Sequence, residues 1–199
     1  MLSSIHPLGE RSRHNRYWLT AGAHVAGGAL GGAVLGALVG VLGWLSLLVL
    51  DQQHVSRVVA FGVMALLVAL VEALSLERRL PSRAHQVDEN WMQKFRGWVY
   101  GSGYGFELGF AVSTIITTAL VHLMLFAMVV SGSWVGAVMI GVVFGAARTG
   151  LVFTTSRITT GQQLRTLLRR VDGWSKQART LGAMLSVTVG VVSFLVVFS

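Results

Sequence analysis

An uninterrupted apolar stretch near the N-terminus most constrains what this chain can fold into. Residues 17–50 contain no Asp, Glu, Lys or Arg. About 20 predominantly apolar residues are enough for a helix to cross the hydrocarbon core of a bilayer. Secretory signal peptides have a shorter apolar region, of about 7–15 residues, followed by a small-residue cleavage site. We therefore expect this stretch to remain attached as the first membrane-spanning helix of an integral membrane protein.

Four further apolar runs follow the first, and each is long enough to cross a bilayer as a helix. The sequence therefore predicts an all-α fold, a polytopic transmembrane helical bundle of about five spans. We expect residues 1–199 to form a single integral membrane domain. The predicted spans cover residues 18–50, 58–76, 103–130, 134–153 and 181–198, with long loops at 77–102 and 154–180.

Lys and Arg residues are concentrated on one side of the predicted spans. The chain has a formal net charge of +8, and its bases lie mainly before the first span and in the two long loops. The opposite connections hold only Arg57. Because cytoplasmic loops carry an excess of Lys and Arg, we predict a cytoplasmic (inner) membrane protein whose N-terminus is cytoplasmic and whose C-terminus lies outside. The expected partners of these bases are anionic lipid headgroups, and not nucleic acid.

The loop at 154–180 contains a stretch with the spacing of an amphipathic helix. Its apolar residues recur at helical intervals, and its charged residues fall elsewhere around the turn. The apolar set is Leu164, Leu167, Leu168 and Val171, and the charged set is Arg165, Arg169 and Asp172. We expect an interfacial helix on the cytoplasmic leaflet, held by apolar burial and by contacts between Arg and headgroups. A docking site for a soluble partner is the alternative.

Glycines in the first span are spaced for close helix packing. Gly28, Gly32, Gly36 and Gly40 lie four residues apart. Small residues at this spacing form a groove that lets a second helix backbone approach, and van der Waals contact then stabilises the pair in lipid. We expect the groove to pack against another span of the same chain. A homodimer interface, or an unwound point in the helix, is the functional alternative.

Few ionisable residues lie inside the predicted spans, where a charge costs about 2.5–3.5 kcal/mol at mid-membrane. Four of them fall at a similar depth near the cytoplasmic side: His24, Glu72, Glu107 and Arg148. One hypothesis is a structural clasp, in which Arg148 pairs with an acid. The other is the floor of a polar cavity, in which Arg148 holds an anionic group and a Glu exchanges a proton.

The third predicted span also carries a polar stripe. On a continuous helix its members fall within an arc of about 80°. They are Glu107, Thr114, Thr118 and His122. Such a stripe favours a path for a solute or a proton. Threonines bonded to backbone carbonyls, together with a satisfied histidine, are the structural alternative.

A weak internal repeat relates two of the glycine-rich segments. Residues 27–34 (GGALGGAV) and 105–112 (GFELGFAV) match at five positions. This match suggests a parallel repeat in which spans one and two correspond to spans three and four. Chance matching in glycine-rich apolar sequence is the alternative.

The glycine-rich spans, the segment GFELGFAVST and the apparent duplication resemble the small polytopic proteins of the cytochrome c biogenesis (CcdA-like) and lysine exporter superfamily. The resemblance covers residues 22–40 and 103–118. The thiol-relay members of that superfamily use paired intramembrane cysteines, whereas this chain has no cysteine. What the resemblance implies here is export of a small solute.

The motifs of several enzyme classes are missing. The sequence contains no G-x-x-x-x-G-K-[ST], H-E-x-x-H or G-x-S-x-G, the motifs of nucleotide hydrolysis, zinc proteolysis and nucleophile-elbow hydrolysis. We expect no metal and no cofactor. The predicted function is therefore a small-solute carrier or permease, and not an enzyme. The alternative is a noncatalytic membrane subunit or assembly factor, in a homodimer or a larger membrane complex.

Overall fold

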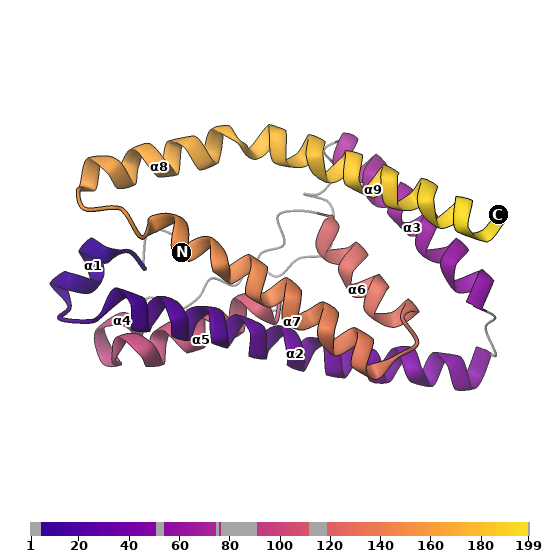
Figure 1. The fold of residues 1–199 in the computed structure, drawn as a ribbon, viewed down its shortest axis with the longest axis horizontal. Helices are drawn as coiled ribbons and strands as arrows, with labels where there is room; N and C mark the ends of the chain where they lie inside the picture. Colours follow the sequence, from indigo (N-terminus) through magenta and orange to yellow (C-terminus); the bar gives the residue numbers. More distant parts are fainter. Residues whose placement is uncertain (1–4, 51–53, 75, 77–90, 112–118, 199) are drawn as a thin grey trace. The chain divides into compact units, whose positions relative to one another are not determined.

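The computed structural model describes residues 5–50, 54–74, 76, 91–111 and 119–198 (Figure 1). All regular secondary structure in these ranges is helical, which confirms the all-α prediction. In chain order the elements are α1 (Pro7–Ser12), α2 (Tyr17–Leu50), α3 (His54–Ala73), α4 (Trp91–Lys94), α5 (Gly97–Gly109), α6 (Leu120–Val130), α7 (Trp134–Gly150), the 3₁₀ helix η2 (Leu151–Thr155), α8 (Gly161–Gly173) and α9 (Ser175–Phe198).

Among the residues that the structure describes, four helical segments are long and apolar enough to cross a membrane, so the chain is a multi-pass membrane protein. They cover Tyr17–Leu47, Val55–Ala73, Trp134–Thr155 and Lys176–Phe198. Large side chains on these segments, such as Leu42, Leu67 and Leu185, are exposed. In a bilayer such surfaces face lipid chains that are as apolar as leucine.

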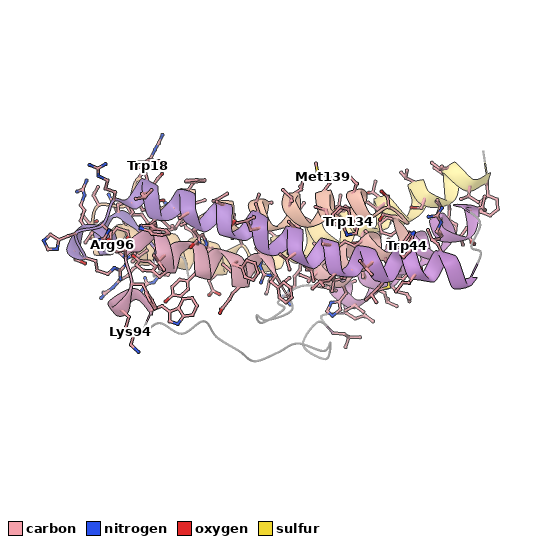
Figure 2. The ribbon with its side chains drawn as sticks, turned by 90° about the horizontal axis from the view of Figure 1, so that it is seen from below. Trp18, Trp44, Lys94, Arg96, Trp134 and Met139 are labelled. Atoms are coloured by element: carbon pink, nitrogen blue, oxygen red, sulfur yellow. The ribbon has the colours of Figure 1, made fainter. Side chains whose placement is uncertain are left out.

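Tryptophans mark the starts of two of these segments. Trp18 of α2 and Trp134 of α7, both labelled in Figure 2, are more exposed than buried. Lys94 and Arg96 lie toward the same end of the picture as Trp18. Tryptophan beside basic residues is typical of a membrane–water interface.

The third predicted span, residues 103–130, is not a single helix. Instead α5 ends at Gly109 and α6 begins at Leu120. Ala111 has a left-handed φ of 51°, and a right-handed helix cannot continue through that conformation. Hydropathy reports how apolar a segment is, and it does not detect such a break. Residues 112–118 lie outside the part of the chain that the structure describes.

The chain divides into two compact units. Unit 1 comprises Met1–Leu35, Arg83–Ile115 and Gly141–Trp174, and unit 2 comprises Gly36–Ser82, Ile116–Ile140 and Ser175–Ser199. The core of unit 1 is aromatic, with Tyr17 of α2 and Tyr100 and Tyr104 of α5 all buried. Ile5, which precedes α1, is buried in the same cluster. The N-terminal segment is therefore part of the folded core of unit 1.

Glycines bring three helices of unit 1 into backbone contact. A Cβ atom added to Gly31 would lie 2.9 Å from the carbonyl carbon of Phe106 on α5. A Cβ added to Gly32 would lie 2.7 Å from the carbonyl carbon of Gly141 on α7. Real side chains do not approach a backbone so closely, so α2 packs this tightly against α5 and α7 because it has glycine at these positions.

The other glycines of the predicted groove also face α7 within their own units. In unit 1, Gly28 faces Gly145, and in unit 2, Gly36 and Gly40 face Ala137. Residues 27–34 of the predicted repeat lie on α2, and residues 105–109 of its second segment lie on α5, which packs against α2 in unit 1. Their shared glycines therefore have a packing role.

Unit 2 is built around α3, α6 and α9. Its buried core contains Ala65 and Val68 of α3 and Leu123 of α6, with Val189 of α9 packed against it. A Cβ added to Gly190 of α9 would lie 2.9 Å from a leucine side chain of α3. Small residues therefore allow close approach of the helices here as well.

Candidate functional site

The predicted site residues are divided between the two units. Of those that the structure describes, unit 1 contains His24, Glu107 and Arg148. Unit 2 contains Glu72 and His122. Thr114 and Thr118 lie outside the described residues. The arc predicted for the polar stripe requires one continuous helix, and the break between α5 and α6 removes that geometry. We therefore consider the contacts of each side chain within its own unit.

Arg148, on α7, lies at the C-terminal end of α5. Its Nη1 atom donates a hydrogen bond to the carbonyl oxygen of Leu108, 3.2 Å away. The last four carbonyls of a helix have no partner within the helix, and that end carries partial negative charge. Leu108 is the penultimate residue of α5, so Arg148 places a positive charge on one of these carbonyls. Glu107, the preceding residue, is half-buried.

Glu72, on α3, makes the opposite contact in unit 2. One carboxylate oxygen accepts a hydrogen bond from the backbone N–H of Ala119 at 2.6 Å, and the side chain is buried. Ala119 is the N-cap of α6. The first N–H groups of a helix lack partners within it, and that end carries partial positive charge. The carboxylate of Glu72 therefore caps α6.

Substituting Glu72 tests this cap. In Glu72→Leu the N–H of Ala119 loses its acceptor, and an unsatisfied buried donor costs about 1–3 kcal/mol. We expect hydrogen exchange in the first turn of α6 to accelerate by about 5- to 150-fold, as these energies imply. Glu72→Gln keeps an acceptor oxygen and should retain protection. Equal exchange in Glu72→Leu and the wild type would contradict the capping role.

His24 links α2 to α5 inside unit 1. Its Nδ1 atom lies 3.2 Å from the carbonyl oxygen of Gly101, and the side chain is 4% exposed. With its proton on Nδ1, the ring donates to this carbonyl. His24, Arg148 and Glu72 thus share one kind of contact, because each bonds to a backbone group of a neighbouring helix.

A buried polar cluster around Glu10 was not among the predicted site residues. Glu10 is 0% exposed. One carboxylate oxygen accepts hydrogen bonds from Arg13, at 2.8 Å, and from the hydroxyl of Tyr100. The other accepts from Thr20 at 2.9 Å. These bonds join α1, α2 and α5, so a carboxylate holds the N-terminal segment to the rest of unit 1.

Tyr100 acts as a hydrogen-bond donor throughout the ordinary pH range. Burial raises the pKa of Tyr100, and its hydrogen bond to the Glu10 carboxylate raises that pKa further. The guanidinium of Arg13 lies 5.6 Å from the centre of the same ring. The cluster is therefore a closed set of donors around one acid. One sequence signal could have revealed this cluster. Glu10 is a single acid in an otherwise basic segment, and it lies three positions before Arg13.

The N-terminal cap of α1 predicts a pH dependence. Nδ1 of His6 accepts a hydrogen bond from the backbone N–H of Gly9 at 3.1 Å, which requires an unprotonated nitrogen. Burial, together with the nearby Arg13 charge, lowers the pKa of His6. The cap therefore contributes its full stability above about pH 6.5, which is the pKa of histidine in the unfolded chain. This stability is lost as the pH falls through the lowered pKa of His6 in the folded protein. We expect faster exchange of the Gly9 amide below that pH, and no such change in His6→Asn, which caps without titrating.

No metal-binding group of three or more His, Cys, Asp or Glu side chains occurs among the residues that the structure describes. A hollow of about 700 Å³ lies between α3 and α9 in unit 2. Its lining is mainly apolar, with Leu66, Leu70, Met184 and Val187 among the contributing residues. This hollow suits hydrocarbon better than a polar solute.

Comparison with known proteins gives a partial match to two curated relatives. No protein-family model matches the chain, and no solved structure matches it. The chain is 30% identical over 151 residues to the methylamine utilization protein MauF of Paracoccus versutus, covering 74% of the chain and 54% of MauF. It is 31% identical over 156 residues to MauF of Paracoccus denitrificans, covering 74% of the chain and 53% of MauF.

These matches correct the resemblance stated from the sequence. The similar proteins are MauF, and not members of the CcdA-like or lysine exporter superfamily. Glycine-rich apolar segments, on which that resemblance depended, recur wherever membrane helices pack closely. The chain spans about half the length of the curated relatives that it matches.

Proposed function

We propose that this chain is a noncatalytic membrane accessory protein of a methylamine utilisation system. The similarity to MauF, a methylamine utilization protein, supports the pathway, and the apolar spans support a membrane location. The observation that carries the accessory role is a pair of charged helix caps: Arg148 caps the C-terminal end of α5, and Glu72 caps the N-terminal end of α6. We place the protein in the cytoplasmic membrane with its basic N-terminus inside, in a complex with other polypeptides.

The helix caps favour this role over the carrier hypothesis. In carriers built from interrupted helices, free helix ends bind the substrate or the coupling ion. Here Arg148 bonds to a carbonyl at the end of α5, and Glu72 bonds to the N-cap N–H of α6. Both contacts are made by side chains of the chain itself. They support a structural role for these charges, in stabilising helix ends inside the membrane.

Deletion of the gene from its host tests the proposal. We expect growth with methylamine as the sole nitrogen source to be lost and growth on ammonium to be unchanged. Uptake of radiolabelled methylamine by the deletion cells should remain, because an accessory protein does not carry the amine. Loss of uptake would support the carrier instead. Unaltered growth on methylamine would contradict a role in its utilisation.

Glu107→Gln distinguishes the two functions within the intact protein. The carrier hypothesis gives Glu107 a proton-exchanging role, which a glutamine cannot perform. The accessory role predicts that a plasmid carrying Glu107→Gln restores growth on methylamine as well as the wild-type plasmid does. Immunoblotting of the membranes controls for expression. A well-expressed Glu107→Gln protein that fails to restore growth would argue against the accessory role.

Native mass spectrometry after mild extraction tests the expected complex. A stoichiometric second polypeptide would support the accessory role. A lone monomer or homodimer, carrying a small bound mass that disappears in Arg148→Met, would support the carrier.

A further inference from the structure

α8 is an exposed helix of unit 1 with a cap of its own (Figure 1). None of its 13 residues, all of which the structure describes, is buried. Thr160 accepts a hydrogen bond from the backbone N–H of Gln163, and Gln163 accepts one from the N–H of Thr160. This capping box fixes the start of the helix locally. The helix therefore forms without being packed into a core, which confirms the predicted amphipathic helix.

The apolar side chains of α8 form one exposed stripe. At 100° per residue they fall within an arc of about 120°. The stripe consists of Leu164, Leu167, Leu168, Val171 and the adjoining Trp174. Leu168, Val171 and Trp174 are 36%, 39% and 59% exposed. Such a stripe is unfavourable in water and needs an apolar neighbour.

Arginines lie on both edges of this stripe. Arg165 falls beyond one edge and Arg170 beyond the other at the same helical pitch. Residues 156–176 contain five bases and one acid, Asp172. A groove of about 590 Å³ beside the stripe is lined by the side chains of Arg157, Leu167 and Arg170 among others. Two guanidinium groups next to an apolar edge match the chemistry of a phospholipid, in which a phosphate adjoins acyl chains.

Short connections join both ends of α8 to apolar segments that are long enough to cross a membrane. The apolar segment before it ends at Thr155, and the one after it begins at Lys176. Five residues, 156–160, precede the helix, and two residues at most separate its end from the next span. A helix of 13 residues is about 20 Å long, so it can lie along the surface between the two connections.

We propose that α8 is a binding site for anionic phospholipid. Its apolar stripe lies among the acyl chains, and Arg157 and Arg170 hold a phosphate headgroup in the groove between them. A lipid fits these observations better than a soluble protein, because the tethers hold the stripe at the bilayer whether or not a partner is present. Trp174, at the end of the stripe, fits the same interface.

Spin labels on the full-length chain test this placement. The sequence has no cysteine, so Leu168→Cys and Gly173→Cys each carry a single label, one on the stripe and one on the polar face, where an added Cβ meets nothing within 4 Å. The protein is reconstituted in nanodiscs of phosphatidylcholine, with or without phosphatidylglycerol. We expect the label at 168 to be shielded from a neutral aqueous nickel complex when phosphatidylglycerol is present. The label at 173 should remain accessible in both lipids.

Arginine variants in the Leu168→Cys background test the groove. Each of Arg157→Gln and Arg170→Gln should lower the ratio of immersed to exposed label about fivefold, the effect of one base near an anionic surface. Arg169→Gln is the matched control, because Arg169 lies on the polar face and outside the groove. Arg169→Gln should lower this ratio less than the other two variants do. If it lowers the ratio equally, then the groove is not the headgroup site.

Two other results would overturn lipid binding itself. A label at 168 that remains accessible in nanodiscs with phosphatidylglycerol would show that the stripe does not enter the bilayer. A label that is equally shielded in both lipids, and indifferent to the arginine variants, would show that the stripe is buried without any anionic headgroup.

Discussion

Replacing Gly32 with alanine is expected to destabilise the protein by about 3 kcal/mol, at the upper end of the usual cost of overpacking. The new Cβ would lie 2.7 Å from the carbonyl carbon of Gly141 and closer still to its oxygen. Both atoms belong to the α7 backbone, so no side chain can rotate away, and α2 and α7 must separate. Chemical unfolding in detergent, followed by circular dichroism, measures the change.

Gly22→Ala is the matched control for Gly32→Ala. Both residues are glycines of α2, but a Cβ added to Gly22 meets nothing within 4 Å. Alanine is the better helix former by about 0.5–1 kcal/mol, so Gly22→Ala should leave stability unchanged or slightly raised. If both variants unfold alike, then the contact with α7 does not account for the loss.

The features that were predicted from the sequence are those with a periodic signal. The spacing of Leu164, Leu167 and Val171 predicts a helix, and α8 forms over these residues. Glycines four residues apart predict close packing, and Gly32 and Gly36 lie against α7 within their units. Periodicity reports which residues share a face, and that is enough to identify helices and their packing surfaces.

The break in the third predicted span and the roles of the buried charges could not be predicted in the same way. No proline marks the end of α5, and the turn at Ala111 depends on a left-handed φ that alanine seldom adopts. Glu72 and Arg148 were recognised as costly charges. Their partners are backbone groups of Ala119 and Leu108, and a backbone partner has no signature in the sequence.

Glu10 was missed because it lies in a basic segment ahead of the first span. An acid among Arg11, Arg13 and Arg16 is ordinarily a solvated surface charge. In the structure it is fully buried, because α1 folds onto α2 and α5 and brings Thr20 and Tyr100 to its two oxygens. Contacts 10 and 90 residues apart in the chain are visible only in the folded protein.

Glu10→Ala is expected to destabilise the protein by about 3–5 kcal/mol, the usual cost of removing one partner from a buried charged pair. The substitution takes the acceptor away from Arg13, Thr20 and Tyr100 together. It also leaves a cavity where the carboxylate was. We expect the N-terminal segment to detach first, so limited proteolysis should cleave ahead of α2 in the variant and not in the wild type.

Two controls separate the cluster from a general effect of charge. Asp172→Ala removes an exposed acid of α8, and an exposed substitution should change stability by less than about 0.5 kcal/mol. Glu10→Gln keeps the shape and one acceptor oxygen but turns an N–H₂ group toward a donor, so its cost should be intermediate. Proteolysis ahead of α2 that is the same in the wild type and Glu10→Ala would mean that the carboxylate does not hold this segment. The order Glu10→Ala, Glu10→Gln, Asp172→Ala, from most to least destabilised, would identify the hydrogen bonds of Glu10 as the attachment of the N-terminal segment to unit 1.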